Sequence, residues 1–159
     1  MNIQIVCVGN LKEAYWREAC AEYAKRLSAY CSFSITEIAE MRLSKSPSAA
    51  EIERVIEDEG ERILQKLPKN GYVIAMCIEG KIISSEQLAQ SISDAALSGK
   101  SSIAVVIGGS HGLSEAVKSR AQLRASMGRM TFPHQLARVM LCEQLYRACS
   151  INNGGQYHK

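Results

Sequence analysis

Three glycines stand where a short apolar segment of the chain ends. Ile103–Ile107 is uncharged and mostly β-branched, which is typical of a central parallel strand, and Gly108, Gly109 and Gly112 follow it directly. A helix is predicted to begin at Ser114. Glycine lets the backbone come close to a ligand, and open α/β sheets bind ligands just outside the carboxyl ends of their strands. This loop therefore predicts a binding site without naming the ligand.

A second group of polar residues interrupts an apolar segment near the C-terminus. Glu143 and Arg147 are spaced i, i+4, and Arg138 precedes them on the same predicted helix. An ordinary intrahelical ion pair would contribute only about 0.3 kcal/mol. Polar side chains set among apolar ones tend to be hydrogen-bonded partners or functional groups, so both interpretations stay open.

The chain closes with a phenol, an imidazole and an ammonium group, on Tyr157, His158 and Lys159. Most such tails are disordered, but this one follows a flexible, glycine-containing segment and could also fold back over a site. His111 lies in the glycine loop as a candidate base, yet it is equally an ordinary turn residue. The sequence assigns it no role.

The elements that must position these groups alternate between strands and helices. This alternation predicts one domain over residues 1–159, with a parallel-dominated sheet flanked by helices. The motifs GxGxxG and GxxxxGK[ST] are absent, which argues against dinucleotide-binding and P-loop proteins. Strands are expected at Asn2–Val8, Ser32–Ala39, Gly71–Ile78, Ile103–Ile107 and Ser126–Phe132, with a turn at Glu79–Lys81. Helices are expected at Leu11–Tyr30, from Ser46 and Pro47 to about Leu67, from Ser85 to about Ser98 behind a Ser84–Gln87 capping box, from Ser114, and at His134–Ser150.

The last of these helices is apolar on more than one face. A helix of this kind must be covered on several sides, so either a partner subunit covers it or it is a core helix of a single chain. Dimerisation is the favoured interpretation. The apolar positions are Leu136, Val139, Met140, Leu141, Leu145 and Ala148.

Composition places the chain among soluble globular proteins. Apolar residues make up 47% and charged residues 22%, and no segment has the length of a membrane span or the pattern of a signal peptide. The six cysteines lack metal-ligand spacing, so no metal is expected and reduced thiols in the cytoplasm are predicted. The net charge is +3, and the window Ala116–Cys142 carries five cations and no acid. That window indicates either a polyanionic partner or an ordinary solvated face.

Several short motifs together resemble one family over the whole chain. In their order and spacing they are similar to those of the bacterial pseudouridine N3-methyltransferases of large-subunit (23S) rRNA, the smallest SPOUT methyltransferases. The matching segments are Ile5–Gly9, Asp58–Leu64, Ile107–Leu113, Met130–His134, Arg138–Val139, Glu143–Ala148 and Tyr157–Lys159.

The resemblance implies a trefoil knot near the C-terminus, an obligate homodimer and S-adenosylmethionine as cofactor. It also implies methyl transfer to N3 of a pseudouridine in a helical hairpin of rRNA in the assembled ribosome. The implied cofactor-binding residues are Met76, Gly108, Met127, Gly128, Arg129, Met130, Thr131 and Phe132.

The implied catalytic residues are Tyr157, His158, Arg138 and Glu143, with the tail covering the site in its own subunit or in the partner. His134 is a further candidate, and Arg138 and Arg147 are expected to offset negative charge on RNA or on the developing anion. Two rival hypotheses stay open. One is a non-catalytic RNA-binding or ribosome-associated module, and the other is a small nucleotide-sensing domain.

Overall fold

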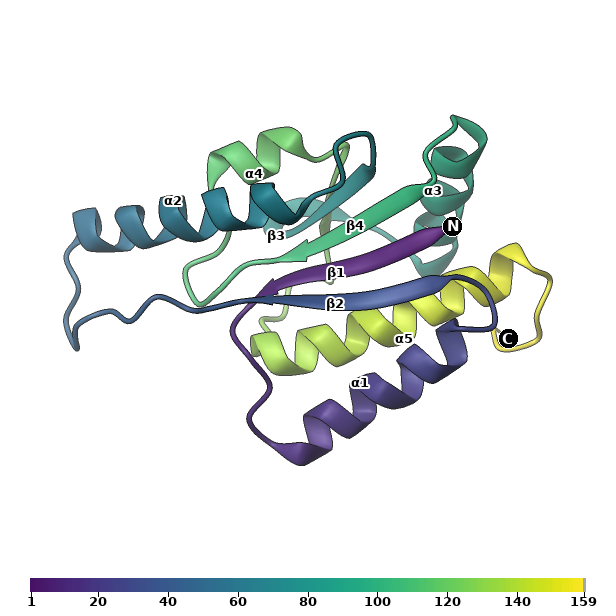
Figure 1. Ribbon diagram of the computed structural model, residues 1–159, viewed down its shortest axis with the longest axis horizontal. Coiled ribbons are helices and arrows are strands. Elements are labelled where there is room, and N and C mark those ends of the chain that lie inside the picture. Colours follow the sequence, from purple (N-terminus) through teal and green to yellow (C-terminus); the bar gives the residue numbers. More distant parts are fainter. Residues whose placement is uncertain (159) are drawn as a thin grey trace.

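Five strands form one sheet in the computed structural model, which describes residues 1–158 (Figure 1). The strands are β1 (Asn2–Val8), β2 (Ser32–Ile38), β3 (Tyr72–Ile82), β4 (Ser102–Ile107) and β5 (Leu123–Ser126). Their order across the sheet is β2-β1-β4-β3-β5, and every neighbouring pair is parallel. The predicted α/β architecture with a parallel sheet is therefore confirmed.

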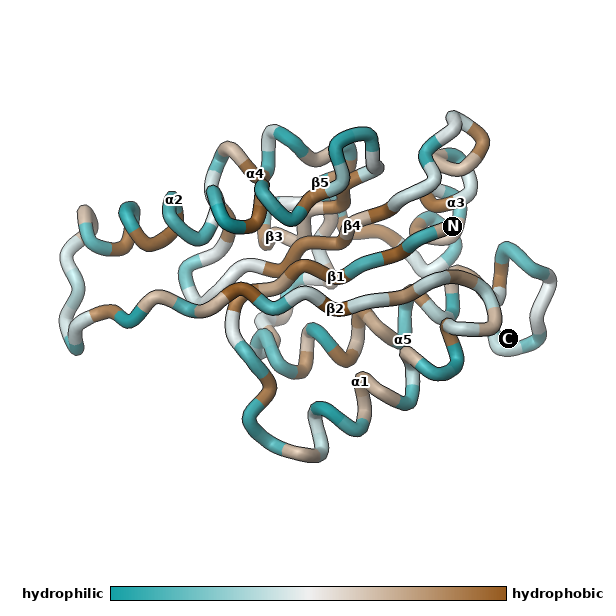
Figure 2. The backbone as a smooth tube through the Cα atoms, in the orientation of Figure 1, coloured by the Kyte–Doolittle hydropathy of each residue, from teal (hydrophilic) through white to brown (hydrophobic). Residues whose placement is uncertain are grey.

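Helices cover both faces of this sheet (Figure 1). One face carries α1 (Ala14–Leu27), α3 (Ser85–Leu97) and α5 (His134–Asn152), and the other carries α2 (Ala49–Lys66) and α4 (Glu115–Arg120). Figure 2 shows apolar residues concentrated along the central strands, as expected for strands buried on both faces. Because all five strands are parallel, their carboxyl ends lie at the same edge of the sheet.

Serine caps fix where three of the helices begin. The predicted capping box of Ser84 and Gln87 is present at α3, and Ser114 caps α4 as the loop sequence predicted. At α2 the cap is Ser48, which forms a capping box with Glu51. The expected start at Ser46 and Pro47 is therefore wrong, because Pro47 precedes the cap.

The third and fifth strands differ most from the sequence prediction. β3 continues to Ile82 through the segment where a turn was predicted, and its register with β5 shifts between Met76 and Lys81. β5 is Leu123–Ser126 rather than Ser126–Phe132. Its pairing begins early because Gln122 bonds both backbone groups of Val73, and Gly128 has a φ of 129°, which no strand adopts. Residues 127–133 consequently form a loop beside the sheet edge.

Helix α5 packs against the sheet and lies between α1 and α3. The single chain thus buries Leu141, Leu145 and Ala148, so much of the helix's apolar character is that of a core helix. Leu136 and Met140 are only half-buried and leave a narrow face for another partner. The homodimer and the trefoil knot both stay predictions.

Candidate functional site

A cavity of about 620 Å³ opens at the carboxyl ends of β3, β4 and β5. The loop that follows β4 forms one wall, and the loop that follows β5 forms another. These loops bring together seven of the eight predicted cofactor residues, all except Arg129. The seven are Met76, Gly108, Met127, Gly128, Met130, Thr131 and Phe132.

The glycine loop closes tightly on itself. Gly109 and Gly112 form an isolated bridge, and the Gly112 N–H donates to the Gly109 carbonyl at 3.1 Å. A Cβ on Gly108 would lie 2.6 Å from the Gly112 carbonyl carbon, so no side chain fits there. Gly112 has a φ of 87°, which glycine adopts without strain. Gly108 is therefore required by the packing of the loop itself.

The middle of α2 packs against the glycine loop and against the start of α4. A Cβ on Gly60 would lie 2.8 Å from the Ser114 Cβ, so the helix touches the start of α4 directly. Its neighbour Glu59 is 5% exposed, and its Oε1 accepts the Met41 N–H at 3.2 Å. Burial raises the pKa of the Glu59 carboxyl. Positions 59 and 60 of the Asp58–Leu64 motif thus lie against the loop.

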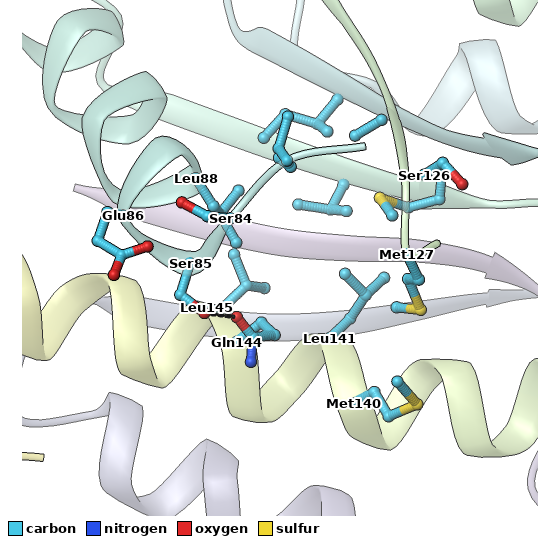
Figure 3. Close-up of a pocket in the computed structure, with 15 residues that line it drawn as sticks. Ser84, Ser85, Glu86, Leu88, Ser126, Met127, Met140, Leu141, Gln144 and Leu145 are labelled. Carbon is cyan, nitrogen blue, oxygen red and sulfur yellow. Dashed lines mark hydrogen bonds between the residues drawn. The ribbon is translucent and has the colours of Figure 1, made fainter. Parts of the chain in front are cut away.

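An apolar groove of about 430 Å³ continues from the cavity along α5 (Figure 3). Met76 and Met127 line both spaces. At its far end the groove reaches Glu86, and on its floor the Ser85 hydroxyl donates to Gln144 Oε1 at 2.6 Å. The groove therefore joins the cavity to the N-terminus of α3.

The C-terminal tail folds back onto α5 at that end of the groove. The Tyr157 hydroxyl donates to Glu143 Oε1 at 3.1 Å, and Arg147 Nε donates to the same oxygen at 3.0 Å. His158 lies 3.3 Å from Arg147 through Nδ1 and 2.7 Å from Glu86 through Nε2. Three of the four predicted catalytic residues thus form one cluster with Glu86 and Arg147. Lys159 lies outside the described residues.

The hydroxyl of Tyr157 acts as a hydrogen-bond donor. Burial, reinforced by the hydrogen bond to Glu143, raises the pKa of Tyr157 to about 12. Its ring stacks edge-on against Tyr146 at 4.7 Å between centroids, and the Arg147 guanidinium lies 4.6 Å from its centroid. The phenol is therefore protonated at neutral pH and does not serve there as the proton acceptor.

Arg138, the fourth predicted catalytic residue, lies apart from this cluster. Its guanidinium is 1% exposed and pairs with Glu37 at 2.5 Å, while a second nitrogen donates to the Gly9 carbonyl at 2.8 Å. A group buried in this way does not face RNA in this structure. The expectation that it offsets RNA charge does not fit its burial, and the contacts favour a role in positioning the loop after β1.

This placement predicts a stability defect for Arg138→Met. The substitution leaves the Gly9 carbonyl without its donor, so the free energy of unfolding should fall by about 2 kcal/mol. Denaturant unfolding measures the change, and Arg138→Lys is the control that keeps the charge but loses the planar fork. Unchanged stability together with lost activity would instead indicate direct action on the substrate.

No pattern in the sequence indicates that Glu86 belongs to the site, because an acidic residue in the first turn of a helix is ordinary. The cavity is also lined by His111, which the sequence places in the glycine loop, and by His134, the further candidate. In the basic window, Lys118 pairs with Glu79 at 2.5 Å and with Glu115 at 2.9 Å. That lysine is therefore paired within the chain, and its side chain, which is 14% exposed, also lines the cofactor cavity.

Two further properties concern the described residues as a set. Within residues 1–158, no group of three or more His, Cys, Asp or Glu side chains is arranged to hold a metal ion. No helix in this range combines the length and apolarity needed to cross a membrane.

Comparison with known proteins identifies the family of the chain. A solved structure from Haemophilus influenzae, described as a probable methylase family protein, covers 99% of this chain and 70% of its own, with a TM-score of 0.52 at 14% identity. That likeness concerns the fold alone. Proteins from Listeria monocytogenes and Clostridioides difficile, both named ribosomal RNA large subunit methyltransferase H, are 52% and 50% identical over 100% of both chains. The family described as predicted SPOUT methyltransferase matches residues 1–158, so the chain belongs to the SPOUT methyltransferases.

Proposed function

We propose that this protein transfers a methyl group from S-adenosylmethionine to N3 of a pseudouridine in large-subunit rRNA of the assembled ribosome. The observation that carries the proposal is the gathering of seven expected cofactor residues around one cavity in a SPOUT chain. Full-length relatives at about 50% identity carry names that state rRNA methylation, which supports the same substrate class.

The cavity fits this cofactor in size and chemistry. Gly112 and Gly128 face open space, with no atom of residues 1–158 beyond their chain neighbours within 4 Å of the position that a Cβ would take, so backbone is available to a ligand. Met76, Met130 and Phe132 supply apolar surface for an adenine ring. When bound, the cofactor supplies a methyl group on a positively charged sulfur, and the protein must orient the acceptor toward it.

The tail cluster has the groups to orient the acceptor base and to manage its N3 proton. An arginine only donates hydrogen bonds, so the Nδ1 of His158 accepts from Arg147 and its Nε2–H donates to Glu86. Both ring nitrogens are thus engaged, and His158 gains an accepting nitrogen only when Arg147 releases it. Arg147 then provides positive charge beside the anion that forms at the base.

A second copy of the chain is proposed to cover the apolar surface beside the cavity. Ile78 is 83% exposed and Met130 is 74% exposed, and both line the cofactor cavity. The half-buried face of α5 with Leu136 and Met140 is further apolar surface. Sedimentation velocity should then show a dimer, and a monomer at all concentrations would contradict the proposal.

Mass mapping of rRNA tests the proposed reaction. Ribosomes that lack the modification are incubated with the protein and cofactor, and we expect one pseudouridine to gain one methyl group at N3. Protein without cofactor is the control, and protein-free rRNA tests the need for the assembled ribosome. Cofactor-independent, salt-sensitive RNA binding without methylation would favour the non-catalytic module instead. Failure to bind the cofactor even at millimolar concentration would exclude the enzyme.

A further inference from the structure

A second and larger cavity lies at the same edge of the sheet. It has a volume of about 740 Å³ and opens at the carboxyl ends of β1 and β2, between the loop after β2 and the glycine loop. In Figure 1, the connections that leave β2 and β4 lie together at this end of the sheet. Ser110 and His111 line both cavities and so form the partition between them. The mechanism proposed above makes no use of this space.

The position of the second cavity is one where open α/β sheets bind ligands. β1 and β4 are neighbours, but the chain leaves β1 toward α1 on one face and leaves β4 toward α4 on the other. Connections that diverge in this way open a crevice outside the strand ends, the topological switch point. Gly9 and Ser110 lie on its two sides.

Two carboxylates with unused accepting capacity line the cavity, one buried and the other exposed. Glu59 is 5% exposed, its Oε1 accepts the Met41 N–H, and its Oε2 lies beside Gly109 with no donor among residues 1–158. Glu40 is exposed and, among residues 1–158, accepts only the Ser110 hydroxyl, at 3.2 Å. Glu37 differs, because Arg138 neutralises it. A ligand with N–H donors would therefore satisfy the buried Glu59 oxygen and could also reach Glu40.

The residues at the wall and the rim of the cavity indicate further chemical groups that the ligand should carry. Ile38, Leu43 and Val55 form an apolar wall, which suits the face of a planar ring. Lys12 and Arg42 lie at the exposed rim, where a phosphate would meet them. Carboxylates accept from the exocyclic amino groups of nucleobases. A ligand that combines a planar ring, an amino group and a phosphate is a nucleotide.

We propose that this cavity binds a second nucleotide of the RNA substrate, near the one that is methylated, with an amino-bearing base toward Glu40 and Glu59 and its phosphate toward Lys12 and Arg42. The proposal rests on the proposed function, since the RNA is the substrate of the adjoining cavity. Proteins that recognise RNA by sequence commonly take splayed single-stranded bases into such pockets. The partition at Ser110 and His111 would then separate the neighbouring base from the cofactor cavity.

Crosslinking identifies the occupant of the cavity. A benzophenone amino acid in place of Leu43 is irradiated with unmodified ribosomes, and the linked nucleotide is mapped by mass spectrometry. We expect a crosslink to an amino-bearing base within a few nucleotides of the methylated one. Crosslinks to a ribosomal protein, to the methylated base itself or to nothing would each overturn the proposal.

Kinetics separate binding at this cavity from a merely structural role. Glu40→Gln should raise the KM for ribosomes about tenfold while the cofactor Kd stays unchanged. Lys12→Ala with Arg42→Ala should also reduce the salt dependence of KM by about one unit of slope per cation. Lys69→Ala, an exposed lysine at the opposite end of the sheet, is the matched control. A changed cofactor Kd, or kinetics equal to the control, would overturn the proposal.

The same assay keeps the two hypotheses distinguishable. If the unaltered protein does not methylate ribosomes, the proposed function fails before any variant is considered. If it methylates them and the cavity variants behave like Lys69→Ala, only the second nucleotide site fails.

Discussion

A chain that ends at Gln156 should bind the cofactor normally yet lose turnover on ribosomes by about 100-fold or more. The physical reason is that neither Tyr157 nor His158 lines the cofactor cavity, whereas both belong to the polar cluster with Glu143 and Glu86. Methyl incorporation measures the turnover, and calorimetry measures the cofactor Kd. Retained turnover in the shortened chain would contradict the assignment of the tail.

Two single substitutions separate the roles within the tail. Tyr157→Phe keeps the ring against Tyr146 but removes the hydroxyl bonded to Glu143. Because the pKa of Tyr157 is about 12, its phenol stays protonated below that pH. The pH profile of Tyr157→Phe at neutral pH should therefore keep the wild-type shape at a reduced rate. His158→Asn removes the imidazole that lies between Arg147 and Glu86, so it should lower the rate further. A neutral-pH limb lost in Tyr157→Phe would show that the phenol itself takes the proton.

Gly108→Ala should abolish measurable cofactor binding. The new methyl group would lie 2.6 Å from the Gly112 carbonyl carbon, so the loop must open and the cavity wall must move. Overpacking of this kind also costs about 2 kcal/mol of folding stability. Calorimetry with S-adenosylmethionine and thermal unfolding measure the two effects separately.

Gly99→Ala is the matched control for this change. Gly99 has a φ of 81° at the C-terminus of α3, and nothing lies within 4 Å of its Cβ position. Alanine there costs roughly 1 kcal/mol through backbone strain alone, far from the cavity. It should lower stability and leave the cofactor Kd unchanged. Equal loss of binding in both variants would mean that general destabilisation, not loop closure, explains the effect of Gly108→Ala.

Prediction from the sequence is most accurate for elements whose position depends on residues close together in the chain. The Ser84–Gln87 capping box and the uncharged segment at Ile103–Ile107 both appear where they were expected, since caps and apolar strands depend on neighbouring residues. The extension of β3 through Gly80 is different. Its backbone packs against Ala125, far away in sequence, and no local pattern contains that contact.

In the candidate site, too, the sequence identifies some residues but not the distant residues that they contact. The short motifs predict that the glycine loop belongs to the site, and the family resemblance predicts the same of the tail. The residues that the loop and the tail contact are distant in sequence. From its sequence, Arg138 is expected to act together with Glu143, yet the fold buries it against Gly9 and Glu37. Glu86 looks like an ordinary first-turn acid and instead holds His158. Those pairings depend on which helices lie side by side.

The burial of α5 between α1 and α3 has a consequence for the order of folding. The helix is the last in the chain, but it covers the same face of the sheet as two helices made much earlier, and Arg138 ties it to Gly9 across 129 positions. Contacts so distant in sequence form slowly, because the intervening chain must be ordered first. During synthesis, the sheet face under α5 therefore stays uncovered until nearly the whole chain has been made. A polypeptide that ends before α5 lacks part of its hydrophobic core. The complete fold and the catalytic activity therefore both require the synthesis of α5.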